Sequence, residues 1–156
     1  MAGFLKIGDP TDSATIIGPV ISAAQRDRIE AHIATAVEDG GELIIGGARP
    51  TDLPKGSYVA PTLITGDNNR RVARQEIFGP VITMIPFDDE DEGIAMANDT
   101  EFGLYDYVFS KDGARALRAA KRLQAGHIGI NTAQRNHGTA ESRRTVWRVQ
   151  NEWCLP

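Results

Sequence analysis

The chain has one cysteine in 156 residues, so no disulfide can form within it. It has no apolar run long enough to cross a membrane. Its net charge of −4 is the opposite of the basic excess that nucleic-acid-binding domains usually carry. We therefore expect neither a nucleic-acid partner nor membrane insertion. Since Met1–Leu5 is too short for the hydrophobic part of a signal peptide, we expect residence in the cytoplasm.

Metal-ligand spacing is also missing. The three histidines and Cys154 are scattered, so we predict no metal site. The acidic run Asp88–Glu92 predicts the start of a helix, because calcium loops need regularly spaced ligands and a distal glutamate. Cys154 and His137 could form a thiolate and its base. However, the sequence around Cys154 gives no sign of the electropositive surroundings that a reactive cysteine needs, so we predict no catalytic role there.

The glycines do not form a phosphate-binding loop. No G-x-G-x-x-G segment opens a helix, and no P-loop pattern occurs. A recognisable pyrophosphate site is therefore absent from this sequence.

The first clear element that is present is a helix beginning after Ser22. Ser22 is a suitable N-cap, and Gln25 three residues later completes a capping-box pattern. Gly40 and Gly41 are expected to end this helix. Its apolar stripe consists of Ile29, Ile33, Ala36 and Val37.

The remaining elements predict an α/β fold. A short strand is expected at 42–45. An extended segment at 58–64 is placed at a sheet edge or in irregular structure, because Pro61 cannot donate a ladder hydrogen bond. Residues 81–85 are almost continuously apolar, which is typical of a strand buried on both faces. Helices at 88–98 and 111–124 then alternate with strands at 107–109 and 127–131. This order predicts a mainly parallel sheet with flanking helices.

Two candidate binding features lie between these elements. In the segment Gln75–Pro80, the carboxylate of Glu76 could accept hydrogen bonds from a pair of sugar hydroxyls, and Phe78 could pack on a flat ring. The alternative is a solvated glutamate beside a phenylalanine that anchors the next strand, and residue types alone favour it. Asn131 ends a predicted parallel strand, where it could either contact a ligand or close a turn.

Taken together, several segments resemble the later part of the catalytic region of the NAD(P)-dependent aldehyde dehydrogenase superfamily. Order and spacing fit over about residues 5–139, and the Glu76–Pro80 motif in this company is specific. The matching segments are Ile7–Pro10, Gly18–Ser22, Tyr58–Leu63, Gln75–Val81, Ala97–Leu104 and Gly126–Asn131.

The resemblance implies a role for two residues. Glu76 would hold the hydroxyls of the nicotinamide ribose, and Phe78 would pack near the nicotinamide ring, with NAD or NADP as cofactor. The implied reaction is the oxidation of an aldehyde to a carboxylic acid by a cysteine thiolate, a glutamate-activated water and hydride transfer.

The chain also departs from the family pattern. Family members are several times longer, and their dinucleotide-binding domain, nucleophilic cysteine and general-base glutamate precede the region matched here. We therefore expect a partial catalytic domain over residues 1–140 and no catalytic residue in the chain. We also expect it to be inactive alone.

Two further departures concern local sequence. Tyr105 stands where the family usually has a small residue, and residues 141–156 lack the segments with which the family continues. We expect 141–156 to be an atypical, poorly ordered tail produced by a truncated gene or a shifted reading frame.

Two alternatives remain open. The chain could be a non-catalytic module that associates with itself through exposed strand edges. It could also be one half of a split enzyme whose N-terminal half is encoded separately. The sequence does not identify the aldehyde.

Overall fold

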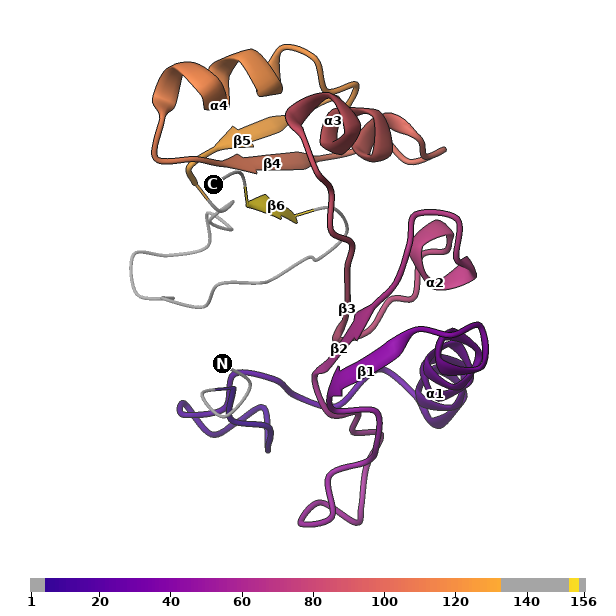
Figure 1. Cartoon of the computed structure of the whole chain (residues 1–156). Coiled ribbons are helices and arrows are strands. Elements are labelled where there is room, and N and C mark those ends of the chain that lie inside the picture. Colours follow the sequence, from indigo (N-terminus) through magenta and orange to yellow (C-terminus); the bar gives the residue numbers. More distant parts are fainter. Residues whose placement is uncertain (1–4, 133–151, 155–156) are drawn as a thin grey trace. The chain divides into compact units, whose positions relative to one another are not determined.

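The computed structural model describes residues 5–132 and 152–154, which fall into two compact units, Met1–Ile85 and Pro86–Pro156. The predicted domain of residues 1–140 spans both. Most of the predicted tail, residues 141–151 and 155–156, lies outside the described residues. The elements in chain order (Figure 1) are α1 Ala23–Glu38, β1 Glu42–Ile45, β2 Thr62–Thr65, α2 Arg71–Arg74, β3 Val81–Met84, α3 Glu90–Asn98, β4 Asp106–Phe109, α4 Gly113–Ala120, β5 Ile128–Ile130 and β6 Glu152–Cys154.

The first unit is a three-stranded sheet with helices on one side. Its strand order is β1-β2-β3, with β1 antiparallel and β3 parallel to β2. Both α1 and α2 lie on the same side of this sheet (Figure 1). The core between them is formed by Ile29, Ile33, Ala36, Val59, Ile64, Val72, Ile77 and Val81.

Helix α1 begins and ends as its sequence predicts. The Ser22 hydroxyl accepts a hydrogen bond from the Gln25 amide, which satisfies one of the free N–H groups of the first turn. At the other end Gly40 has a φ of 89°. The amides of Gly40 and Gly41 donate to the carbonyls of Val37 and Ala36, the pattern that closes a helix with a left-handed glycine.

One strand prediction in this unit is wrong, and another is confirmed only in part. Residues 81–85 were expected to be buried on both faces, but Ile82 is 37% and Met84 is 50% exposed. The reason is that β3 is the last strand of its sheet and the helices cover one face only. The segment 58–64 was placed at an edge or in irregular structure. Residues 58–61 are irregular, but the strand that follows them, β2, is the central strand. Pro61 precedes β2, so its missing N–H costs the ladder nothing.

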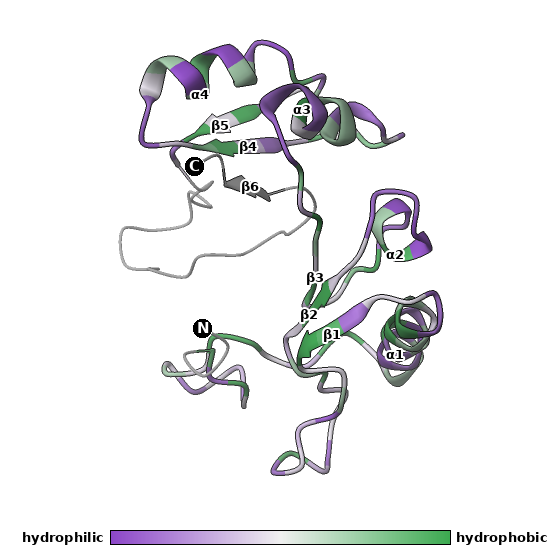
Figure 2. Cartoon of the chain, in the orientation of Figure 1, coloured by the Kyte–Doolittle hydropathy of each residue, from purple (hydrophilic) through white to green (hydrophobic). Residues whose placement is uncertain are grey.

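The second unit contains a parallel sheet of order β5-β4-β6. Helices α3 and α4 pack on one face of it (Figure 1), around a core of Ile94, Val108, Ala116, Ala119 and Ala120. Figure 2 shows hydrophilic and hydrophobic residues alternating along both helices, as expected for helices with one buried face.

The unit matches the predicted α/β class, but two details differ. Strand β3 belongs to the other sheet, so the crossover from β3 through α3 to β4 does not join strands of one sheet. Helix α4 also begins later and ends earlier than predicted. Asp112 caps its start by accepting hydrogen bonds from the amides of Ala114 and Arg115.

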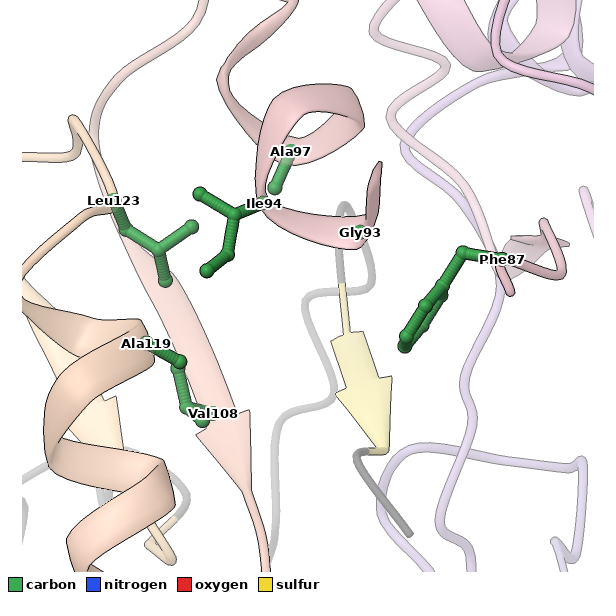
Figure 3. A pocket seen from close by; sticks show the side chains of 7 residues that line it. All are labelled: Phe87, Gly93, Ile94, Ala97, Val108, Ala119 and Leu123. Atoms are coloured by element: carbon green, nitrogen blue, oxygen red, sulfur yellow. The ribbon is translucent and has the colours of Figure 1, made fainter. Parts of the chain in front are cut away.

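A small gap remains in the core of the second unit (Figure 3). It encloses about 20 Å³, and in Figure 3 the side chain of Leu123 faces Ile94 across it. Its lining is apolar throughout, so it offers no polar group to hold a ligand or a water. We interpret it as a packing gap. The lining residues are Phe87, Gly93, Ile94, Ala97, Val108, Ala119 and Leu123.

Among the described helices, none has the length and hydrophobicity needed to cross a membrane.

The carboxylate of Asp106 is buried in the second unit. Asp106 opens β4, whose first three residues are buried, and only 8% of the residue is exposed. Burial disfavours the charged form and raises the pKa of the Asp106 carboxyl above its ordinary value of 3.8. Between these two pKa values the folded chain binds more protons than the unfolded chain, so stability falls as the pH rises through that window.

We predict that Asp106→Asn is more stable than the wild type, by a margin in the free energy of unfolding that grows as the pH rises above about 4, because the amide carries no charge to bury. Urea unfolding followed by circular dichroism at several pH values measures this margin. Asp52→Asn, at an exposed loop position, is the matched control and should show a margin that does not change with pH. A margin for Asp106→Asn that is negative or constant over this range would contradict the prediction.

Candidate functional site

The candidate site is the loop 75–80, which joins α2 to β3. Its centre is Ile77, which is 8% exposed and belongs to the core of the first unit. Its neighbours point elsewhere. Glu76 is half-buried, and Phe78 is 66% exposed. The exposed face of this ring is available for packing. The loop therefore places a carboxylate and an aromatic ring on either side of one buried anchor.

The backbone of Phe78 has a left-handed conformation, with φ of 54°. A bulky residue rarely adopts this conformation without support from its surroundings. That support comes from α1. The Nε2 atom of Gln25 donates hydrogen bonds to the carbonyl oxygens of Ile77, at 2.9 Å, and of Phe78, at 3.2 Å. The capping-box pattern predicted a role for Gln25 at its own helix end, but its side-chain nitrogen is used on a loop 52 residues away.

The next two residues fix the loop to the sheet. Gly79 lies against Ile29 so closely that an added Cβ would stand 2.5 Å from the Ile29 Cδ1 atom. The amide of Thr62 donates to the Pro80 carbonyl at 2.8 Å, which extends the pairing of β2 with β3. The loop is thus held on one side by α1 and on the other by β2.

Helix α1 is itself anchored further along its length. Arg49, in the loop after β1, donates from Nε and Nη2 to the two carboxylate oxygens of Glu30 at 2.5 and 2.7 Å. This bidentate pair lowers the pKa of Glu30 below its ordinary value, chiefly through the hydrogen bonds from Arg49. Because the pair is partly exposed, its contribution to stability is modest, and its value is in orienting α1.

The structure decides between the two alternatives for Asn131. Its Oδ1 accepts from the Ser110 amide at 2.8 Å, and its Nδ2 donates to the Ser110 carbonyl at 2.9 Å. Its backbone is left-handed, with φ of 51°. The side chain thus continues the pairing of β5 with β4 by one step. The Asn131 amide therefore has a structural role, as the second alternative had it, although its bonds join two strands and do not close a turn.

Of the remaining candidates, the structure describes the side chains of the acidic run alone. The acidic run starts α3, as predicted, with Asp89 accepting from the Glu92 amide at 2.9 Å. His137 lies outside the described residues, and only the backbone of Cys154 is described. In the part of the chain that the structure describes, no three metal-ligating side chains are grouped.

Comparison with known sequences points to one family. A sequence model of the aldehyde dehydrogenase family matches residues 2–142. Betaine aldehyde dehydrogenase 1 of Rhizobium meliloti is 48% identical over 130 residues, which cover 82% of this chain and 27% of the relative. The 5-carboxymethyl-2-hydroxymuconate semialdehyde dehydrogenase of Escherichia coli is 39% identical over 137 residues, which cover 84% of this chain and 29% of the relative. The chain thus spans little more than a quarter of the length of these relatives.

Solved structures agree with this result. A betaine aldehyde dehydrogenase from Staphylococcus aureus in complex with NAD+ superposes with a TM-score of 0.80 at 40% identity, over 83% of this chain and 26% of that one. A Mycobacterium tuberculosis aldehyde dehydrogenase complexed with NAD+ superposes with a TM-score of 0.83 at 39% identity, over 88% of this chain and 29% of that one. These matches confirm the α/β fold class predicted from the sequence.

The contact between Gly79 and Ile29 generates a prediction about the loop. We expect Gly79→Ala to destabilise the chain by about 1–3 kcal/mol, because the new methyl group overlaps the Ile29 side chain. In the Ile29→Ala background, which lacks the Cδ1, Cγ1 and Cγ2 atoms that the new methyl group would meet, the same change should cost clearly less. A double-mutant cycle measured by urea unfolding gives the coupling between the two positions.

Gly66→Ala is the matched control. An added Cβ at Gly66 meets only the Arg70 side chain, at an ordinary 3.7 Å, so the cost should stay within about 0.5 kcal/mol. If Gly79→Ala lowers the free energy of unfolding equally in the two backgrounds, the close contact between Ile29 and Gly79 does not constrain the loop.

Proposed function

The chain belongs to the aldehyde dehydrogenase family, and we propose that Glu76 and Phe78 form the nicotinamide-ribose side of an NAD(P)+ site. The observation that carries this proposal is the loop itself, in which Ile77 is buried, Phe78 is 66% exposed and Glu76 is half-buried. A carboxylate has two acceptor oxygens, which suit the vicinal hydroxyls of a ribose. The open ring of Phe78 suits a flat heterocycle. Relatives crystallised with NAD+ support the choice of cofactor.

The reaction we propose for the whole enzyme is the oxidation of an aldehyde and water to a carboxylic acid. NAD(P)+, when bound, supplies the acceptor for the hydride that leaves the aldehyde carbon. In this chain Glu76 would fix the ribose and thereby the position of the attached ring. Phe78 would cover one face of that ring and exclude water from it. The two relatives above are named for two different aldehydes, so the substrate is left at the level of the class.

The direct test of this site is the affinity for NADH, measured by nuclear magnetic resonance on the ¹⁵N-labelled chain. We expect NADH to shift the amide signals of residues 76–79. Glu76→Gln should weaken binding about tenfold, because it removes the charge from an acceptor worth about 1.5 kcal/mol or more. Glu42→Gln, at an exposed position of β1, is the control and should bind as the wild type does. Equal affinities for wild type and Glu76→Gln would contradict the proposal.

We further propose that the chain does not oxidise aldehydes by itself. Nucleophilic catalysis of this kind needs an activated thiolate with a base near the ring. The family resemblance places neither of them at a position of this chain, and Cys154 is not at a matching position. Purified protein mixed with NAD+, NADP+ and a panel of aldehydes should therefore form no NADH or NADPH. Turnover would contradict this expectation, and its response to Cys154→Ala would show whether Cys154 is the nucleophile.

A second candidate function is self-association, which one feature of the first unit favours. Ile82 and Met84 alternate with buried Val81 along β3 and lie on the face of the sheet that α1 and α2 leave open. Apolar side chains on an edge strand are a common site for pairing with another chain. The partner would be a second copy or a separately encoded N-terminal half of a split enzyme.

Sedimentation velocity tests the self-association. We expect the wild type to form dimers or larger species as its concentration rises, and Met84→Lys to remain monomeric, because a lysine on an edge strand opposes pairing. Ile21→Lys is the control, since Ile21 is 95% exposed but lies outside the sheet. A wild type that is monomeric at all concentrations would exclude a second copy. Reading frames beside the coding sequence would then show whether a complementary half exists.

A further inference from the structure

We propose that Gln25 is a positioning residue for the proposed cofactor site: its side-chain amide holds the turn that presents Glu76 and Phe78. This inference rests on the proposed function for its role in binding, while its structural part stands on the contacts of Gln25 alone. Gln25 itself acts through the backbone of the loop.

The first step is the shape of the turn. In an extended strand successive carbonyl groups point to opposite sides, so one donor cannot reach two in a row. At Phe78 the left-handed conformation turns the chain, with φ of 54°. The carbonyl oxygens of Ile77 and Phe78 then both lie within hydrogen-bonding distance of the single Gln25 Nε2 atom, at 2.9 and 3.2 Å. An amide NH₂ carries two hydrogens, one for each carbonyl. The pair of bonds therefore selects the left-handed form.

The second step concerns what else could hold this form. Asn131 is the other non-glycine residue with positive φ in the described chain, and its own side-chain amide stabilises it. Phenylalanine has no polar group for this purpose, so Phe78 depends on neighbours. Glycine could adopt the conformation freely, but it would present no ring. Gln25 thus allows an aromatic residue to occupy a position that favours glycine.

The third step is the rigidity of the donor. Gln25 lies in the first turn of α1, where Ser22 caps the helix. Ile29, one turn further on, packs against Gly79. Gln25 and Ile29 thus lie in the same helix. Gln25 donates to Ile77 and Phe78, and Ile29 packs against the next residue of the loop, Gly79. Binding to a turn that is already formed costs less ordering entropy than binding to a mobile one.

The test uses the whole chain and reads the turn without any ligand. A strong nuclear Overhauser effect between the amide and α protons of one residue marks a positive φ. We expect this signal at Phe78 in the wild type and its loss in Gln25→Ala and Gln25→Glu, neither of which has the donor. Gln124→Ala, the same substitution at an exposed position, should retain it. Retention in Gln25→Ala would overturn the inference.

A measurement on the wild type tests the inference even if a Gln25 variant fails to fold. The Gln25 side-chain amide protons should show Overhauser effects to protons of Phe78 and Gly79, and their absence would overturn the inference without any mutation. In folded variants the amide signals of β2 should stay in place while those of residues 77–79 move. Movement throughout the first unit would assign Gln25 a general structural role instead.

NADH affinity is the second readout, and it separates this inference from the proposed function. With Glu76 and Phe78 intact, Gln25→Ala should weaken NADH binding about tenfold, because the turn must be formed during binding. If the wild type binds no NADH, the proposed cofactor site fails, while the Overhauser signal still decides the role of Gln25. If Gln25→Ala loses the signal but binds NADH as tightly as the wild type, the turn does not serve the cofactor.

Discussion

The candidate site depends on the burial of one side chain, that of Ile77. Anchoring Ile77 in the core beside α1 fixes the loop between α2 and β3 at its midpoint. Its neighbours on either side must then turn away from the core, which exposes the Phe78 ring and leaves Glu76 half-buried. The hydrogen bonds from Gln25 and the close approach of Gly79 to Ile29 complete this arrangement. A change in any of these contacts would alter the site without touching Glu76 or Phe78.

This construction explains how a short motif can act in binding. The motif supplies a carboxylate and a ring, but their positions come from a helix that begins some fifty residues earlier. The ion pair of Arg49 with Glu30 belongs to the same arrangement, because it helps to orient the helix that holds the loop. In the proposed function the loop contributes one side of a cofactor site. Phosphate contacts and the attacking sulfur would be supplied by residues that the family resemblance does not place in this chain.

Local sequence predicted local structure well. The Ser22 cap, the glycine end of α1 and the acidic start of α3 depend on neighbouring residues, and each is confirmed. Features that depend on distant partners were not predictable. The apolar residues of β3 could not reveal that one face of their sheet lacks helices. Likewise, the spacing of Ser22 and Gln25 gave no indication that Gln25 bonds to Ile77 and Phe78.

The assignment of Glu76 and Phe78 to a cofactor site stays a prediction. The motif identified Glu76 and Phe78 as candidates. Residue types alone favoured a solvated glutamate beside a phenylalanine that anchors the next strand, and the family resemblance reversed this preference. The sequence did not predict the left-handed backbone at Phe78, because an aromatic residue gives no sign of positive φ. For Asn131, by contrast, the structure decided between two roles that the sequence left open.

The central claim is that the loop 75–80 binds the nicotinamide-ribose half of the cofactor and does not bind the adenosine half. Its most direct test compares the two halves of the cofactor by nuclear magnetic resonance of the ¹⁵N-labelled chain. Reduced nicotinamide mononucleotide should shift the amide signals of residues 76–79, and adenosine monophosphate at the same concentration should leave them in place. Equal shifts with both nucleotides, or none with the nicotinamide half, would contradict the account.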